Sequence, residues 1–199
     1  MSYRDFTFSD IEGKLGLTLE TISLFPNVEP IAPRPEFLRT LTRGAAFAQG
    51  IDTEKARSEF VIAPLLLEFL GLRNDQNAIF SGIEFNIDPA VGLNGYCDFL
   101  ITRSPRLLIV TAPIVAVAEA KNDNVNTGLG QCVATMRAAW LFNTAKGAPV
   151  SQVYGATTTG AHWKFLRLRD TMVSIDRDDY YLADIGRILG ILQYMVETA

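Results

Sequence analysis

Three charged residues lie inside otherwise apolar segments of this sequence and could do chemistry together. Asp98 lies in the middle of the run GYCDFLIT, and Glu119 and Lys121 end the run IVAVAEAK. Residues two apart on a strand point to the same face, so we expect Glu119 and Lys121 to project together. Ionised groups at the end of a buried strand are costly to desolvate unless they are paired or bind a metal. These three side chains are therefore the first candidates for a functional site.

Two carboxylates and an ammonium group suit metal-assisted hydrolysis. If the strands of Asp98 and Glu119 are neighbours, both acids can reach one ion, and a cation relieves their mutual repulsion. Oxygen ligands with room for water are what Mg²⁺ or Mn²⁺ requires. Such an ion would polarise a phosphate ester and lower the pKa of a bound water, while Lys121 holds or activates that water. The residue types therefore predict hydrolysis of phosphoester bonds.

The segments around these residues predict the elements that position them. Alternating or continuous apolar residues predict strands over 15–24, 78–88, 96–103, 114–121, 150–158 and 162–168. Helical spacing predicts helices over 36–48, 54–71, 126–143 and 182–196, the second of them capped by Asp52 or Thr53. The proline-rich stretch from Pro26 to Pro35 predicts an extended surface crossing, and Pro64 predicts a kink in the second helix. This order predicts an α/β fold with a mixed sheet, in which the strand 114–121 is central.

The charged residues resemble the motif of the PD-(D/E)xK nuclease superfamily, in which an acid on one strand and an (Asp/Glu)-x-Lys on the next bind Mg²⁺ and cleave DNA. Asp98 stands at the position of the first acid, and Glu119, Ala120 and Lys121 stand at the second motif. Cys97 is a departure, because it precedes Asp98 where the family usually has proline. The resemblance implies a restriction-endonuclease-like fold, which is a central mixed β-sheet flanked by α-helices.

Further segments carry the same resemblance and add two residues to the site. The run EKARSEFVIAPLLLEF is similar to the family's first core helix, whose glutamate would be Glu59, although Glu54 and Glu68 lie on the same helix. The run GLGQCVATMRAA places Gln131 where relatives often carry a glutamine that faces the active site. The run VYGATTTGAHWKFLRL is similar to the closing strands of the N-terminal nuclease domains of type I restriction subunits. The resemblance thus implies Mg²⁺ or Mn²⁺ as cofactor, with Asp98, Glu119, Lys121 and Gln131 in catalysis and Glu59, Asp98 and Glu119 as metal ligands.

Composition narrows the possible classes of protein. The 199 residues are 48% hydrophobic and 20% charged, which predicts one folded domain over 1–199, with an N-terminal extension at 1–35 and a core at 36–199. Because the sequence shows neither an export signal nor an apolar run of membrane-spanning length, we expect a cytoplasmic protein whose Cys97 and Cys132 remain buried thiols. The net charge of −4 does not favour binding to nucleic acid, whose phosphates are negatively charged. We therefore expect a homodimer or a partner protein to complete the DNA-binding surface.

The sequence leaves other interpretations open. Glu119 and Lys121 could form a surface ion pair where a strand leaves the sheet, and Gln131 could bond only to backbone near a helix start. The chain could be a catalytically inactive nuclease-fold protein that acts as a binding or regulatory partner, or an unrelated α/β protein with an accidental ExK. His162 lies in a predicted turn and has no part in the predicted mechanism. Residues 176–179 are typical of a solvated acidic turn rather than a calcium loop.

Overall fold

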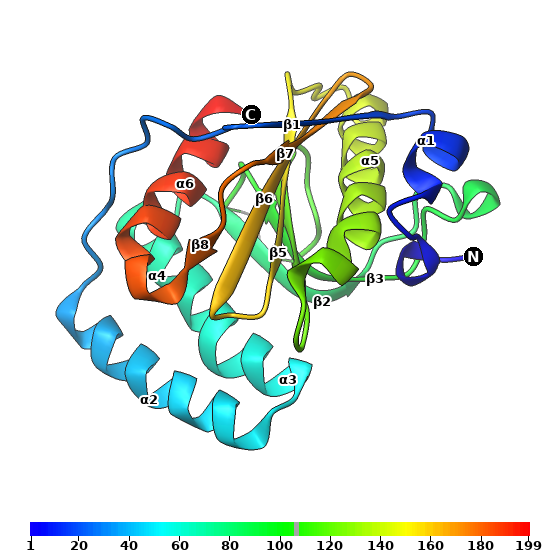
Figure 1. Ribbon diagram of the computed structural model, residues 1–199. Helices are drawn as coiled ribbons and strands as arrows, with labels where there is room; N and C mark the ends of the chain where they lie inside the picture. Colours follow the sequence, from blue (N-terminus) through cyan, green and yellow to red (C-terminus); the bar gives the residue numbers. More distant parts are fainter. Residues whose placement is uncertain (106–107) are drawn as a thin grey trace.

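The centre of the molecule is a mixed β-sheet, seen in a computed structural model that describes residues 1–105 and 108–199 (Figure 1). The strands of the described chain are β1 (Thr18–Ile22), β2 (Ala78–Glu84), β3 (Tyr96–Thr102), β4 (Ile114–Ala120), β5 (Val153–Thr158), β6 (His162–Arg169), β7 (Met172–Asp176) and β8 (Tyr180–Tyr181). They form one eight-stranded sheet in the order β1-β7-β6-β5-β4-β3-β2, with β8 paired to β6. The pairs β1–β7 and β4–β5 are parallel and the other pairs are antiparallel. The predicted α/β fold with a mixed sheet is therefore confirmed.

Helices cover both faces of this sheet. The helices of the described chain are α1 (Asp10–Leu15), α2 (Pro35–Ile51), α3 (Glu54–Arg57), α4 (Ala63–Leu72), α5 (Leu129–Ala145) and α6 (Ile185–Thr198), with a π-helical turn η2 (Ser58–Ile62) and 3₁₀ turns η1 (Tyr3–Asp5), η3 (Pro89–Val91), η4 (Val125–Gly128) and η5 (Leu182–Asp184). Figure 1 shows α1 and α5 on one face and α2, α4 and α6 on the other. This arrangement is consistent with a restriction-endonuclease-like fold. Across residues 1–105 and 108–199, none of the helices has the length and apolar character needed to span a membrane.

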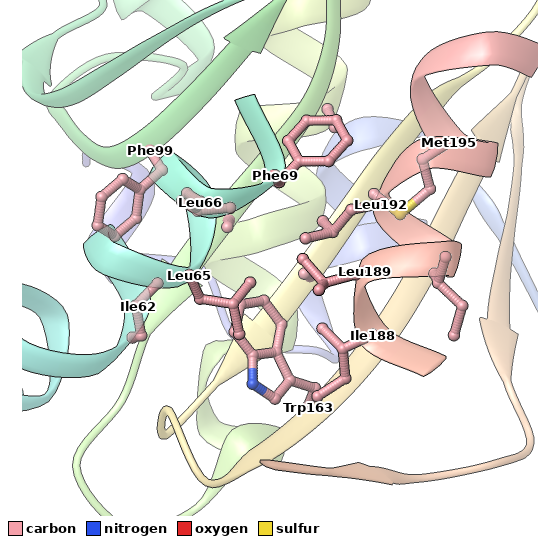
Figure 2. Packing of buried hydrophobic residues seen from close by; sticks show 14 of the residues in the cluster. Ile62, Leu65, Leu66, Phe69, Phe99, Trp163, Ile188, Leu189, Leu192 and Met195 are labelled. Atoms are coloured by element: carbon pink, nitrogen blue, oxygen red, sulfur yellow. The ribbon is translucent and has the colours of Figure 1, made fainter. Parts of the chain in front are cut away.

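Each face of the sheet has its own hydrophobic cluster. On the side of α4 and α6, Trp163 of β6 lies beside Leu65 and Ile188 (Figure 2). On the side of α5, the cluster includes Cys97 and Cys132, which are free and buried as expected. The strands between these two layers are therefore held in fixed positions, as are the charged residues at their ends.

The strand β4 carries the second predicted motif. All seven of its residues are buried, and it pairs with β3 on one side and β5 on the other. Near-continuous hydrophobicity is typical of a strand that is covered on both faces, so the predicted central position is confirmed. The strand ends at Ala120, and Lys121 follows at the edge of the sheet.

The predicted second helix is divided by the π-helical turn η2. The hydroxyl oxygen of Thr53 accepts a hydrogen bond from the N–H of Ala56 at 3.2 Å, so Thr53 is the cap of α3. The turn η2 leads directly into α4, which has Pro64 in its first turn. Proline lacks an N–H and clashes with the carbonyl four residues before it, which a regular α-helix cannot accommodate. The predicted kink therefore takes the form of a wider turn, and that turn carries Glu59.

Three elements at the outer part of the fold, α1, β7 and the two-residue β8, are not among the predicted helices and strands. Asp176, at the end of β7, is 0% exposed. Its carboxylate accepts hydrogen bonds from the backbone N–H groups of Leu24 at 3.1 Å and Asp178 at 3.3 Å, and from the hydroxyl of Tyr180 at 2.8 Å. The interpretation of 176–179 as a solvated turn is wrong for Asp176, because three donors compensate for its burial.

Candidate active site

The strands β3 and β4 bring Asp98 and Glu119 to the same edge of the sheet. Phe99 of β3 and Ala118 of β4 are paired in register, and Asp98 and Glu119 come next on their strands. The Oδ2 atom of Asp98 accepts a hydrogen bond from the backbone N–H of Ala120 at 2.8 Å. This bond fixes the Asp98 carboxylate across the two strands, and the negative charge of Asp98 acts on the carboxyl group of Glu119, its neighbour in the register of β3 and β4. The two acids therefore meet, as the sequence predicts.

Gln131, in the first turn of α5, links the acid of the second motif to its lysine. Its Nε2 atom donates to Oε2 of Glu119 at 2.7 Å, and its Oε1 atom accepts from Nζ of Lys121 at 3.1 Å. An amide can do both because it carries a donor and an acceptor on one planar group. Glu119 and Lys121 therefore interact through Gln131, and both project toward α5.

Thr135 is a neighbour of Glu119 that the sequence reasoning missed. Its hydroxyl oxygen lies 3.4 Å from Oε1 of Glu119 and 3.0 Å from the carbonyl oxygen of Gln131, and its side chain is fully buried. Residues four apart on a helix share a face, so the spacing of Gln131 and Thr135 was the available signal. The Glu119 carboxylate thus has an α5 side chain near each of its two oxygens.

Burial dominates the electrostatics of the site. Glu119 is 0% exposed, whereas Asp98, Lys121 and Gln131 are partly buried. Burial raises the pKa of the Glu119 carboxyl well above its ordinary value, the negative charge of Asp98 raises it further, and the ammonium of Lys121 opposes part of the rise. An additional positive charge at this place would stabilise the ionised form of Glu119.

The donor set fits a hydrated divalent cation. Mg²⁺ commonly binds through one or two carboxylates and keeps several waters, and Asp98 and Glu119 supply two carboxylates. Within residues 1–105 and 108–199, no three His, Cys, Asp or Glu side chains gather as a metal-binding group. The hydroxyl of Thr157, which lies opposite Glu119 on β5, is buried without a hydrogen-bond partner among the described residues. The site therefore suits an ion that retains water better than one enclosed by protein ligands.

Glu59 does not lie with the other predicted residues in this structure. Its side chain is 52% exposed on η2, and its Oε1 atom pairs with Nζ of Lys55 at 2.9 Å. The two residues are four apart, which is a common spacing for a solvated helical ion pair. The structure thus brings together Asp98, Glu119, Lys121 and Gln131, and leaves Glu59 at the surface.

The segment after β4 is anchored at Lys121 itself and at the next residue, Asn122. The backbone N–H of Lys121 donates to the carbonyl of Thr158 at 2.8 Å. The guanidinium of Arg57 donates to the side chain of Asn122 at 3.2 Å and to Asp52 at 2.7 Å. These contacts restrict the position from which the Lys121 side chain extends.

His162 is the first residue of β6, not a turn residue as predicted, and belongs to a separate group of side chains there. Its Nε2 atom lies 3.0 Å from Oδ1 of Asp179, and its ring stacks on Tyr181 with ring centroids 5.0 Å apart. Lys164 donates to the same Asp179 oxygen at 3.1 Å. The side chain of Asp123, beyond Lys121, is exposed and accepts a hydrogen bond from Asn122 at 3.1 Å.

Comparisons with known proteins do not assign this chain to a family. No family model matches it, and no curated protein matches it. One solved structure that is similar to it is the cryo-EM structure of the DrdV–DNA complex, with a TM-score of 0.48 at 11% sequence identity. The match covers 82% of this chain but only 14% of that one. This likeness is too loose to support a function. A functional proposal for this chain therefore depends on the geometry of its side chains.

Proposed function

We propose that this protein is a Mg²⁺-dependent nuclease domain that hydrolyses phosphodiester bonds in DNA. The observation that supports this proposal is the chain of contacts from Lys121 through Gln131 to the fully buried Glu119, with Asp98 beside it. A solvated ion pair at a strand end would be exposed and would not need a glutamine from a helix. Two acids and a lysine converging at the edge of a sheet are suited to metal-assisted attack of water on a phosphate.

The roles of the residues follow from their positions. Asp98 and Glu119 would hold the ion, and when bound there Mg²⁺ or Mn²⁺ supplies polarisation of the scissile phosphate and a lower pKa for a water. Gln131 holds the ammonium of Lys121 at 3.1 Å and thereby aims it at the site. From that position Lys121 would hold the attacking water and offset the negative charge that develops in the transition state.

Glu59 keeps the metal-binding role that the resemblance implies as part of this proposal. To take it up, the carboxylate must leave its ion pair with Lys55, whose side chain is 81% exposed. Exposed pairs of this kind contribute at most about 1 kcal/mol, so exchanging Lys55 for a divalent cation is energetically accessible.

The partner of the domain is also part of the proposal. The net charge of −4 offers little attraction to a phosphate backbone. We therefore expect a second copy of the chain or a partner protein to contribute part of the DNA-binding surface.

The decisive experiment is DNA cleavage with matched variants. Plasmid, linear and single-stranded DNA are incubated with Mg²⁺, Mn²⁺ or chelator, and we expect cleavage only with the metals. Lys121→Ala and Asp98→Asn should each lower the rate by about 10²-fold or more. The Asp98→Asn variant keeps an oxygen that can accept from the N–H of Ala120, so it preserves the fold while removing the charge. Wild-type cleavage rates in both variants would contradict the assigned roles.

An inactive nuclease-fold binding protein remains the second candidate. The observation that favours it is that the polar groups of Lys121, Gln131 and Glu119 already satisfy one another, while Glu59 lies outside the group. Calorimetric titration with Mn²⁺ separates the two candidates. The nuclease should show a binding site that Asp98→Asn weakens, whereas the inactive protein should show none.

A further inference from the structure

Thr157, the fifth residue of β5, has a buried hydroxyl that makes no hydrogen bond with the described residues. Its side chain is 0% exposed, and its Oγ1 atom has no hydrogen-bond partner among the described residues. The next threonine, Thr158, is also fully buried, but its hydroxyl donates to the carbonyl of His162 at 2.9 Å and accepts from the N–H of Gly160 at 2.8 Å. A valine would occupy the space of Thr157 without burying an unpaired polar atom. The hydroxyl therefore makes the folded protein less stable than a valine at this position would.

The position of Thr157 relates it to the proposed catalytic residues. It is in register with Glu119 of β4 on one side and with Lys164 of β6 on the other. Side chains directly opposite one another project on the same face of a sheet, so Thr157 shares the face of Glu119. The ammonium of Lys164 pairs with Asp179 at 3.1 Å.

Gly128 shows that Thr157 and Lys121 converge. A Cβ atom on Gly128 would lie 2.8 Å from Cε of Lys121 and 3.1 Å from Cγ2 of Thr157. The Cγ2 methyl of Thr157 and the Cε methylene of Lys121 therefore lie around one point at the start of α5, and Glu119 lies opposite Thr157 on the same face of the sheet. Because Thr157 is inaccessible to a ligand as large as a nucleotide, a partner for its hydroxyl at this point has to be small.

We infer that Thr157 positions the attacking water of the proposed nuclease reaction, by a hydrogen bond that forms, once the metal and DNA are bound, between its hydroxyl and the water that Lys121 holds. This inference rests on the proposed function and adds a residue to it. A threonine hydroxyl can donate one hydrogen bond and accept others, so it can orient a water whose remaining contacts come from Lys121. Retaining an unpaired hydroxyl at a cost in stability is typical of active sites, where groups are arranged for the bound state.

Three variants of the full chain test this role. Thr157→Val removes the hydroxyl and keeps the shape, Thr157→Ser keeps the hydroxyl and removes a methyl group, and Thr158→Val removes a hydroxyl that is already hydrogen-bonded. Each variant is measured by thermal unfolding and by the kcat and KM of DNA cleavage with Mg²⁺.

Stability and activity should change in opposite directions in Thr157→Val. We expect its Tm to rise by about 2–4 °C because an unpaired polar atom is removed, while Thr158→Val should lower the Tm. We also expect the kcat of Thr157→Val to fall about tenfold with KM unchanged, since the contact is made to the water and not to DNA. Thr157→Ser should keep a kcat within about threefold of the wild type despite a lower Tm.

The possible results separate the two proposals. A Thr157→Val protein with a higher Tm and a wild-type kcat would overturn the role of Thr157 and leave the nuclease proposal standing. A Thr157→Ser protein as slow as Thr157→Val would also overturn it, because the hydroxyl would then not be the group that matters. A wild-type protein that cleaves no DNA with either metal would remove both proposals together.

Discussion

Replacing Gly128 by alanine should disable the site without disturbing the fold. The new Cβ would lie 2.8 Å from Cε of Lys121 and 3.1 Å from both Cγ of Lys121 and Cγ2 of Thr157, whereas ordinary contacts are 3.4–4 Å. Cε belongs to a flexible side chain, so the lysine and not the backbone should yield, by about 0.6–1 Å. The φ angle of Gly128 is −88°, which any residue adopts, so the substitution adds no backbone strain.

The size of the effect follows from that displacement. The hydrogen bond from Nζ of Lys121 to Gln131 is 3.1 Å long. Lengthening it by about 0.6–1 Å would break it. Misplacing a catalytic group by about 1 Å can cost about 10²-fold in rate, or about 2.7 kcal/mol of transition-state stabilisation. We therefore expect Gly128→Ala to lower the kcat of DNA cleavage about 10²-fold and to shift the Tm by no more than about 3 °C.

The assay compares plasmid cleavage by the wild type, Gly128→Ala and a control, Gly50→Ala. A Cβ on Gly50 would meet nothing within 4 Å, so the control should cleave at the wild-type rate. If Gly128→Ala cleaves as fast as the wild type while Lys121→Ala does not, the displacement of the lysine is not what the packing implies. If Gly128→Ala unfolds at a much lower temperature, the backbone has yielded instead of the side chain.

Two further predictions concern stability alone. In Gly155→Ala the new Cβ would lie 2.4 Å from Sδ of Met136 and 2.7 Å from Sγ of Cys132, so urea unfolding should show a loss of about 1–3 kcal/mol that Met136→Ala partly restores; an unchanged midpoint would mean that α5 moves freely. In Asp176→Ala the hydroxyl of Tyr180 and two backbone N–H groups lose their acceptor, so we expect a loss of about 3 kcal/mol or more, with a smaller loss in Asp176→Asn; equal losses in the two variants would show that hydrogen bonding is not the cause.

Local patterns in the sequence predict several features that the structure confirms. The continuous apolar run 114–121 predicts the interior strand β4, because only a strand covered on both faces tolerates so few polar residues. The cap at Asp52 or Thr53, which the structure places at Thr53, and the interruption near Pro64 also follow from the chemistry of single residues. These features depend on near neighbours in the chain, which is why periodicity and residue type are sufficient to predict them.

Pairing between distant segments is less accessible to such reasoning. The strand β7 has an ordinary composition and is identified by its parallel pairing with β1, whose Thr18 lies opposite Met172. Asp176 looks like a solvated residue in its own segment, yet it is buried, and the backbone N–H of Leu24 compensates for that burial with a hydrogen bond. Local composition could not reveal either feature, because the partner lies about three quarters of the chain away.

The candidate site combines both kinds of information. The sequence by itself determined that Glu119 near the end of a buried strand and Lys121 directly after it project on the same side, because alternation along an extended chain is a local rule. Only the tertiary structure decided that Asp98 meets Glu119, that Gln131 joins Glu119 to Lys121, and that Glu59 pairs with Lys55 at the surface. The physical reason is that the packing of helices on the sheet decides which side chains from separate elements face one another, and no single segment encodes that packing.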